Sequence, residues 1–328
     1  MYDDAHKLEI KNMIDATITE VRSMTNALMP STLKDFGIGL LTSIDRMQIN
    51  YSENNSSFLP GYLPTPGFIG TMKPTFGYTM GSQRDVRHIA AQNGWLTTFD
   101  QFNQQYSETH NENLDYSINT EPISDLKIDF TGGKTYATNF TENFNTTDTN
   151  GDGLSNTYNS LIQNTFGNFN ISTSLIRTAF SKSDANQSAT FDDFRDNRLI
   201  VANRLARDFY GNTTFPLDAE GFPVGFGKNS QRVLLPSFLA AYHGTDPEKV
   251  STGAFRDIPI PNWQLKYTGL MKLPWFKKNF KRFSVQHGYT SSYTVNQFNT
   301  NLLFDRNTDQ DAATAQRDQA GNFLNNTL

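Results

Sequence analysis

The chain of 328 residues contains no cysteine. This absence excludes disulfide bonds, zinc sites built on thiolates and a cysteine nucleophile. The sequence also lacks any run of the roughly 20 consecutive apolar residues that a membrane-spanning helix requires. The sequence also shows none of the catalytic patterns that we considered. Gly133-Lys134-Thr135 lacks the earlier glycine of a phosphate-binding loop, and the five histidines show no metal-ligand spacing. We therefore predict that the chain is not an enzyme.

Apolar residues are scarce, since 37% of the chain is hydrophobic and the mean hydropathy is -0.55. Aromatic residues nevertheless make up 13%, with 26 phenylalanines and 13 tyrosines. A β-barrel of an outer membrane shows this combination, because one side of each strand is polar and its loops are long and polar. The net charge of -5 and the scattered basic residues give no basis for nucleic-acid binding.

Residues 262–304 have the sequence pattern of a β-hairpin. Two arms, in which apolar and polar residues alternate with a period of two, flank a short basic and aromatic turn at residues 273–278. In an outer-membrane barrel one face of such a hairpin meets lipid and the other meets the aqueous lumen. We predict lipid-facing or membrane-rim anchors at Trp263, Tyr267, Trp275, Phe276 and Tyr289, and lumen-facing side chains at Gln264, Lys266, Gln286 and Thr290. A half-buried hairpin of a soluble sheet has the same alternation, and sequence does not fix which face is which.

Other segments predict further elements. A second hairpin is expected with arms at residues 114–120 and 126–130 around a turn at 121–125. Helical periodicity is visible at residues 82–93, 191–209 and 231–242, and we expect Pro236 to break the last of these helices. The last two helices fall in an insertion of helices and loops that we place at about residues 146–260.

Residues 1–29 have a different pattern, that of an amphipathic helix ended by Pro30. The start of the chain shows no basic stretch followed by the apolar core of a secretory signal peptide. The segment 1–39, with Glu20-Val21-Arg22 and Met29-Pro30, resembles the second dimerisation helix of bacterial sensor histidine kinases. The histidine and ATP-binding boxes of that family do not follow, so no kinase residue is carried over. We interpret residues 1–39 as a fusion or a misplaced start, with a genuine dimerisation element as the alternative.

Residues 40–328 resemble a second family through many ungapped blocks in the same order. These blocks include Leu59-Pro60-Gly61-Tyr62, Asn93-Gly94-Trp95-Leu96-Thr97, Phe191-Asp192-Asp193-Phe194-Arg195, Leu217-Asp218-Ala219-Glu220-Gly221-Phe222-Pro223, Leu235-Pro236-Ser237-Phe238-Leu239-Ala240-Ala241-Tyr242 and Pro261-Asn262-Trp263. The family is SprA, the gliding-motility cell-surface proteins that form the outer-membrane translocon of the type IX secretion system in Bacteroidota. Its members are several times longer, so the resemblance implies a fragment.

The SprA resemblance implies a function in protein transport. Folded cargo proteins with type IX sorting domains would cross a wide lumen to the cell surface, in support of gliding motility. The implied partners are a barrel protein that receives cargo, a periplasmic plug protein and the lipid of the outer membrane, and the implied location is the outer membrane or cell surface. The predicted fold class is mainly β: a partial set of antiparallel strands from a very large outer-membrane β-barrel, with helical loop insertions and one N-terminal amphipathic helix.

One local motif predicts a calcium site. Asp148, Asn150, Asp152 and Asn156 place oxygen atoms at the spacing of a calcium-binding loop, with glycine at the sixth position, although the bidentate glutamate is replaced by Asn159. The alternative reading of residues 148–156 is a turn rich in Asx residues. With calcium bound, the alternative function is a soluble or surface β-rich binding or adhesin module. No other cofactor is expected.

Overall fold

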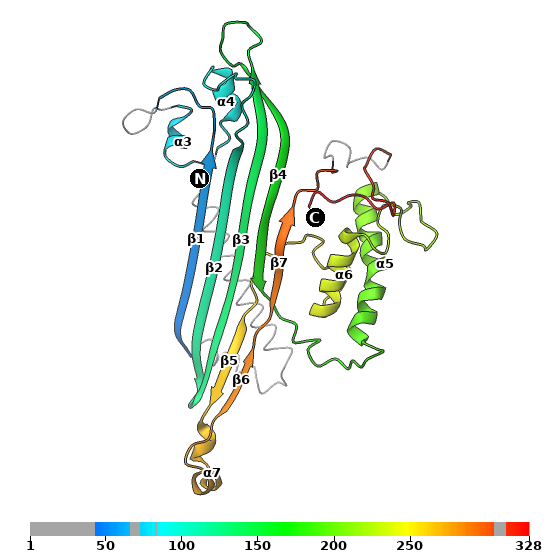
Figure 1. Cartoon of the computed structure of the whole chain (residues 1–328). Coiled ribbons are helices and arrows are strands. Elements are labelled where there is room, and N and C mark those ends of the chain that lie inside the picture. Colours follow the sequence, from blue (N-terminus) through cyan, green and yellow to red (C-terminus); the bar gives the residue numbers. More distant parts are fainter. Residues whose placement is uncertain (1–42, 66–72, 83, 305–312, 328) are drawn as a thin grey trace.

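The computed structural model describes residues 43–65, 73–82, 84–304 and 313–327 (Figure 1). Its strands are β1 (Ile44–Phe58), β2 (Tyr106–Ile123), β3 (Leu126–Thr147), β4 (Thr157–Ser172), β5 (Asn262–Tyr267), β6 (Val285–Tyr289) and β7 (Ser292–Asn299). Its helices are α3 (Phe76–Thr79), α4 (Arg87–Gln92), α5 (Ala189–Tyr210), α6 (Gln231–His243), α7 (Pro274–Asn279) and the 3-10 helix η2 (Gly269–Lys272). The prediction of a mainly β fold is confirmed, and the predicted N-terminal helix lies outside the described residues.

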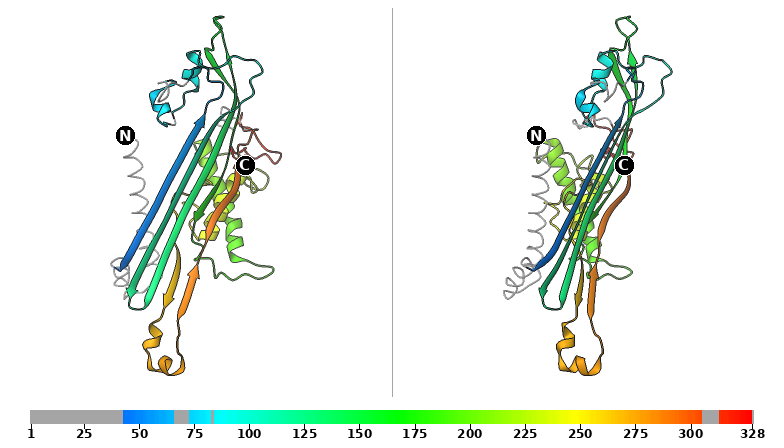
Figure 2. Two further views of the ribbon diagram at one scale, coloured as in Figure 1. Left: turned by 60° about the vertical axis from the view of Figure 1, so that its left-hand side comes forward. Right: turned by 90° about the vertical axis from the view of Figure 1, so that its left-hand side faces the viewer.

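All seven strands belong to one antiparallel sheet in the order β1-β2-β3-β4-β7, with β5 and β6 off this path. Strand β3 uses one edge for two partners, because its residues 126–131 pair with β5 and its residues 134–147 pair with β4. Strands β4 and β5 thus form one interrupted column, and β6 and β7 form the next. Within the described residues β1 does not pair with β6 or β7, so the sheet is open (Figure 2).

Residues 173–261, which include α5 and α6, are inserted at the break in the β4–β5 column. Backbone groups close the sheet around this break. The Ser172 carbonyl oxygen accepts a hydrogen bond from the Ile260 N–H (3.0 Å), and the Thr173 N–H donates to the Ser291 carbonyl oxygen (3.1 Å). The N–H of Gly133, which lies between the two paired segments of β3, donates to the Ser172 hydroxyl (3.1 Å). The chain therefore leaves and rejoins the sheet at neighbouring points.

The predicted hairpin at residues 114–130 is confirmed as the pair β2 and β3. Its turn consists of Ser124 and Asp125, and Asp125 adopts a positive φ of 72°, a conformation that short polar residues tolerate. The N–H of Asp125 donates to the Glu121 carboxylate (3.0 Å). The strands are much longer than predicted, at 18 and 22 residues. Strand β2 begins before residue 114 and β3 continues beyond residue 130, because the alternation continues there with more polar residues.

The register divides the sheet into two faces of different chemistry. On one, here called the apolar face, neighbouring strands align apolar side chains in rows such as Met47, Ile118, Phe130, Trp263 and Tyr289. On the opposite, polar face the rows consist of amides, hydroxyls and occasional charges, such as Gln48, Ser117, Thr131 and Asn262. The period-two pattern of the sequence is thus present on five adjacent columns of strand.

Helices lie against the upper part of the apolar face, where the upper end of the sheet is the one near α4 and the lower end is the one near α7 (Figure 1). From the insertion, Phe255 contacts the rings of Tyr136, Phe169 and Phe298 at centroid distances of 5.3, 5.2 and 5.0 Å. Buried residues of α5 and α6 form a cluster that reaches Tyr293 of β7. At the upper end, α4 contributes to a separate cluster on β2 and β3. The helices therefore cover the upper part of the apolar face, as the side views show (Figure 2).

Local signals explain the two long helices. The Ser188 hydroxyl accepts from the Phe191 N–H at the start of α5, and Gly211 ends this helix in the left-handed conformation that glycine adopts readily. Helix α6 continues through Pro236, which is buried, so Pro236 does not break it. Both predicted helices are confirmed.

Three predicted boundaries were wrong. The insertion predicted at about residues 146–260 begins later, because residues 157–172 form β4 and alternate in step with β3. The predicted helix at 82–93 is shortened to α4 among the described residues. The predicted short turn at 273–278 is instead part of a connection that contains η2 and α7, since Pro274 occupies the first helical turn, where proline is favourable.

A buried carboxylate fastens α4 to the sheet. Glu142 of β3 is 1% exposed, and it accepts hydrogen bonds from Tyr158 (2.6 Å), Gln163 (2.7 Å), Ser160 and the guanidinium of Arg87. Burial raises the pKa of Glu142, but these hydrogen bonds and the charge of Arg87 outweigh it and hold the pKa below the usual 4.5.

We expect Glu142→Gln to lower the free energy of unfolding by about 3 kcal/mol at pH 7, because it removes the buried one of the two carboxylates, Glu142 and Asp85, that pair with Arg87. A carboxylate whose pKa is depressed by folding stabilises the protein above its unfolded-state pKa and loses this effect as the pH falls through the folded-state value. The difference between the two proteins should therefore shrink on acidification below about pH 5. Urea unfolding followed by tryptophan fluorescence measures both effects.

Glu220→Gln, which removes an exposed ion pair with Lys228, is the matched control and should change stability by less than about 0.5 kcal/mol. An equal loss in both variants, or a loss in Glu142→Gln that does not depend on pH, would contradict the role given to the buried carboxylate.

Candidate functional site

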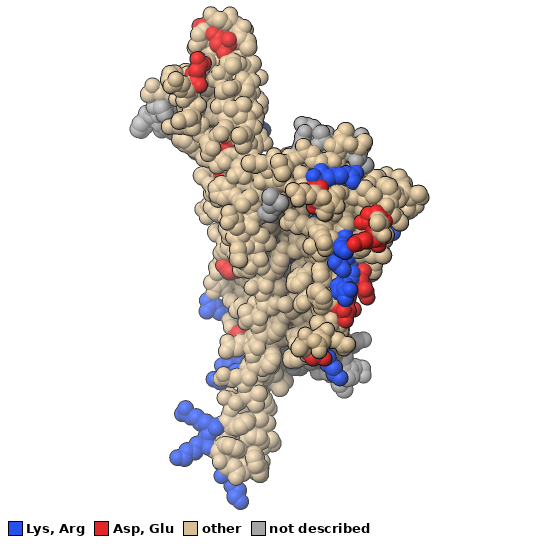
Figure 3. Space-filling view, turned by 45° about the vertical axis from the view of Figure 1, so that its right-hand side comes forward, with Lys and Arg blue, Asp and Glu red and all other residues tan. Residues whose placement is uncertain are grey.

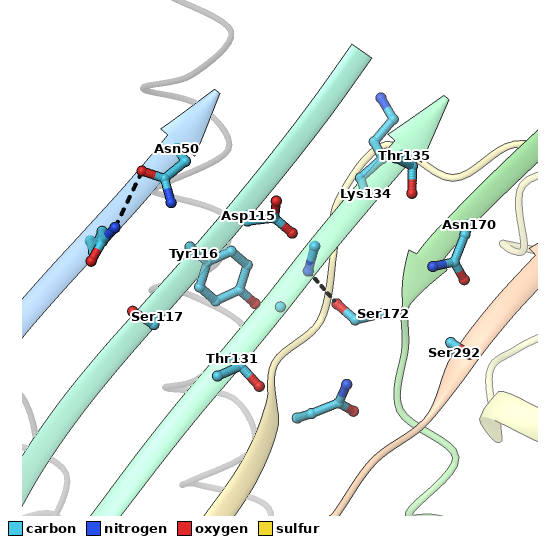
Figure 4. Close-up of a pocket in the computed structure, with 14 residues that line it drawn as sticks. Asn50, Asp115, Tyr116, Ser117, Thr131, Lys134, Thr135, Asn170, Ser172 and Ser292 are labelled. Atoms are coloured by element: carbon cyan, nitrogen blue, oxygen red, sulfur yellow. Dashed lines mark hydrogen bonds between the residues drawn. The ribbon is translucent and has the colours of Figure 1, made fainter. Parts of the chain in front are cut away.

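The break in the β4–β5 column leaves a hollow of about 480 Å³ on the polar face of the sheet (Figure 4). It is lined by side chains from β1, β2, β3, β4, β5 and β7, among them Asn50, Asp115, Ser117, Thr131, Asn170, Ser172 and Ser292. β4 pairs with β3 above the hollow and β5 pairs with β3 below it. The hollow therefore exists because the inserted segment separates β4 from β5.

Two glycines of β3 make the floor. A Cβ atom on Gly132 would lie 2.4 Å from the ring and hydroxyl of Tyr116, which crosses it on the apolar face. A Cβ atom on Gly133 would lie 2.6 Å from the Asp115 carboxylate on the polar face. The Tyr116 hydroxyl donates to the Pro259 carbonyl oxygen (3.0 Å), which ties the end of the insertion to the sheet beneath the hollow. Side chains on both faces thus require this glycine pair.

The walls are rich in carboxamides. On β1, Gln48 donates to Asn50 (3.4 Å). Across the hollow, the Asn170 oxygen accepts from the Thr294 hydroxyl (2.7 Å), and the Asn262 oxygen accepts from the Ser291 N–H (2.8 Å). These groups offer both donors and acceptors with little net charge. The arrangement can hydrogen-bond water or the polar surface of a passing molecule.

The titratable side chains among the residues that line the hollow are Asp115, Tyr116 and Lys134. Histidine is not among the residues that line the hollow in the described structure, so the hydroxyls of Ser117, Ser172 and Ser292 lack an imidazole base. Nor does any group of three or more His, Cys, Asp or Glu side chains in the described ranges form a potential metal site. The conclusion that the chain is not an enzyme stays a prediction.

The predicted site residues of the first hairpin arm lie where the alternation requires. Trp263 and Tyr267 project from the apolar face, and Trp263 stacks on Tyr289 with ring centroids 4.5 Å apart. Gln264 and Lys266 lie on the polar face, paired with Gly288 and Gln286 of β6. The alternation is therefore present, while the assignment of these faces to lipid and lumen stays a prediction. Thr290 lies at the break between β6 and β7 and belongs to neither strand.

The remaining predicted anchors, Trp275 and Phe276, belong to α7 at the lower end of the sheet. Their rings contact each other (5.0 Å) and join Phe280 and Phe283, while Trp275 keeps 62% of its surface exposed. Figure 3 shows basic side chains that project from the lower tip of the molecule, and the sequence has Lys277, Lys278, Lys281 and Arg282 in this segment. The lower tip is thus both aromatic and cationic.

The loop at residues 148–156 closes on itself at the opposite end. The Asp148 carboxylate accepts from the N–H groups of Asn150 (3.0 Å), Gly151 (2.7 Å) and Gly153 (2.7 Å), which lower its pKa. The Asn156 oxygen accepts from Thr149 (3.2 Å). This is the hydrogen bonding of an Asx-rich turn. The calcium site at Asp148, Asn150, Asp152 and Asn156 stays a prediction.

No family model matches the chain, and no curated protein matches it. In the part of the chain that is described, no helix is long and apolar enough to cross a membrane.

Sequence reasoning missed the hollow, although a signal was present. Two adjacent glycines inside an alternating strand mark a place where another part of the protein approaches the backbone closely. The partner that approaches, Tyr116, could be recognised only from the β2–β3 register, in which it is paired with Gly132.

We expect Gly132→Ala to destabilise the protein by about 1–3 kcal/mol, because the added methyl group overlaps Tyr116. Gly288→Ala on β6 is the matched control, since a Cβ atom there has nothing within 4 Å, and it should be neutral within about 0.5 kcal/mol. Thermal unfolding of the full chain compares them. Equal melting temperatures for the two variants would show that the floor is not tightly packed.

We expect calcium to leave the melting temperature unchanged, because the Asx-turn hydrogen bonds already satisfy the Asp148 carboxylate. Thermal unfolding measured in about 5 mM EDTA and in millimolar calcium, the extracellular range, tests this expectation. The Asp152→Asn variant serves as the control for any rise. A rise in wild type that Asp152→Asn removes would instead establish the calcium loop and favour the adhesin reading.

Proposed function

We propose that the sheet is a section of the wall of a large outer-membrane β-barrel. The observation that carries the proposal is an apolar band on the lower half of the apolar face. It consists of five successive rows, from Leu126 paired with Tyr267 up to the row of Tyr51, Leu114, Lys134 and Ile171, in which Lys134 is the charged member and reaches up to Glu112. Along β3 these rows cover residues 126–134, close to the roughly 9–11 residues that a tilted strand needs to cross a bilayer.

Charge limits the band above. In the next row Glu53 is paired with Glu112, whose carboxylate binds the Lys134 ammonium (3.3 Å), and His110 lies 3.8 Å from Glu53. Side chains of this kind are costly in hydrocarbon and favourable at its surface. The bilayer would therefore end at this row. The helices α5 and α6, which carry many charged residues, pack against the sheet at and above Tyr293, level with the uppermost row of the band.

The band is limited below by α7 and the connection around it. Exposed tryptophan, clustered phenylalanines and four basic side chains at this tip match the aromatic and cationic residues that settle at a membrane interface. The two-residue β2–β3 turn is at the same end as the β5–β6 connection at residues 268–284, and the connections at residues 59–105 and 148–156 are at the other. The β2–β3 turn is short in the way that is typical of the periplasmic side of such barrels, and the connection at 59–105 is long in the way that is typical of their outer side.

Strand length supports the same placement. The 22 residues of β3 extend over roughly 70 Å, while a strand needs only about 9–11 residues to cross a bilayer. The upper half of the sheet would stand outside the membrane and carry the helical layer. The polar face, with Gln264, Lys266 and Gln286, would line an aqueous lumen, and the β1 and β6–β7 edges would pair with strands of the rest of a longer wall.

Together with the SprA resemblance of residues 40–328, these features support a part in the outer-membrane translocon of type IX secretion. The wall would conduct folded cargo proteins that carry type IX sorting domains, in support of gliding motility. A water-lined face of amides and hydroxyls suits such transport, since it binds no surface strongly. A barrel protein that receives the cargo and a periplasmic plug are the proposed partners.

Three tryptophans at different heights test the membrane placement. Variants that keep one of Trp95, Trp263 or Trp275, with phenylalanine at the other two positions, are inserted into vesicles that contain brominated lipids. We expect deep bromines to quench Trp263, which lies within the band, and shallow bromines to quench Trp275 at the tip. Trp95, which packs near α4 at the upper end, should remain unquenched.

Neighbouring residues on opposite faces supply a second measurement. Leu265→Lys places a charge on the apolar band and should lower the stability of the inserted protein by about 2–4 kcal/mol. Gln264→Lys, on the polar face, should have little effect. Equal quenching of the three tryptophans, or equal stability of the two lysine variants, would overturn the membrane placement and favour a water-soluble β-rich module.

A further inference from the structure

A cationic pocket lies where the insertion leaves and rejoins the sheet. It has a volume of about 460 Å³ and is bounded by the end of β4, the C-terminal end of α6 and the segment that returns to β5. Its lining includes Arg177, His243, Lys249 and Arg256 but the carboxylate of Asp246 alone. The pocket therefore has an excess of positive charge.

The two guanidiniums in the pocket are held by neutral oxygen atoms. Both Nη atoms of Arg256 donate to the Ser251 carbonyl oxygen (3.2 Å each), and Nη1 of Arg177 donates to the Gly244 carbonyl oxygen (3.2 Å). Within the described residues neither arginine forms an ion pair with a carboxylate, and Asp246 is engaged by Lys249 (3.7 Å). Positive charge is thus gathered here without a matching negative charge on the pocket wall.

One donor in this pocket has no partner. The Nε atom of Arg256 is buried and makes no hydrogen bond within the described structure. Burial also lowers the pKa of the Arg256 guanidinium and, together with the charge of Arg256, that of His243. A half-buried guanidinium that has only carbonyl oxygens as partners is unfavourable, and an anion in the pocket would supply the missing negative charge.

We propose that this pocket binds a phosphate group. Guanidinium groups match the geometry of phosphate oxygens, and Lys249 would add a mobile charge at the entrance, where its side chain is 84% exposed. On the wall, the Thr173 hydroxyl and the His243 Nε2 atom form a hydrogen bond with each other (2.9 Å).

The position of the pocket indicates one source of the phosphate. Ile171, which lines the pocket, belongs to the uppermost row of the apolar band, where the proposed function places the bilayer surface. A lipid headgroup phosphate would reach the pocket at this height. The lipid source rests on the proposed function, whereas the phosphate chemistry of the pocket does not.

The test uses the full chain in detergent and titrates inorganic phosphate and pyrophosphate by calorimetry. We expect saturable binding that Arg256→Gln weakens by at least about tenfold, the effect of losing a charged hydrogen bond. Because Arg256 is partly buried, Arg177→Gln provides a second variant, which should weaken binding without unfolding. Arg282→Gln at the distant tip is the matched control and should bind as the wild type does.

The His243 ring resonances supply an independent readout, since they should shift on addition of phosphate in the wild type and in Arg282→Gln. Absence of binding, or equal affinity in Arg177→Gln, Arg256→Gln and Arg282→Gln, would overturn the proposal.

Vesicles with and without a phosphomonoester lipid distinguish the source. Competition between phosphate and these vesicles, lost in Arg256→Gln, would support a headgroup ligand. Phosphate binding without competition would retain the pocket and assign it to free phosphate. If the tryptophan experiment fails while phosphate still binds, the membrane placement falls and the anion site stands.

Discussion

The structure depends on how the backbone groups of β3 are satisfied along one edge. No single strand accompanies β3 on this side, because β4 ends at Ser172 and β5 begins at Asn262. The gap between them is bridged by the Ser172 hydroxyl, by Ile260 and by the side chain of Asn262. Unpaired N–H and carbonyl groups in the middle of a sheet are unfavourable, so these few bonds allow an insertion where a strand would otherwise be continuous.

The apolar face of the sheet is covered to different extents along the length of the strands. Above Glu112 the aromatic rows of β3, β4 and β7 are covered by Phe255 and the helices of the insertion. Below it, Leu114, Tyr116 and Ile128 on β2 and β3 are buried, whereas β1 leaves Met47 and Ile49 with 46% and 36% of their surface exposed. The apolar face is therefore open along β1, where it is available for contact with other surroundings.

Sequence alone predicted the elements that follow from hydrophobic periodicity and from residues that end helices and strands. The alternation in Trp263, Leu265 and Tyr267 and the helix ended by Gly211 are local properties, and both are present. The strand β4 was missed because its polar residues read as loop, and its place is determined by cross-strand partners far away in the sequence. The hollow and the cationic pocket arise from the same long-range junction, so the glycine pair at Gly132 and Gly133 marks a close approach without giving its partner, and no local pattern at Arg256 marks the pocket.

The close approach of Ser172 and Ile260 has a consequence for how such a sheet can change over time. A segment whose two ends meet at one point can be lengthened, shortened or exchanged without shifting the strands on either side. The strands must keep their register with their neighbours, whereas the helical layer is constrained only by the residues that it contacts. The sheet and its insertion can therefore evolve separately, as a conserved frame that carries an interchangeable surface.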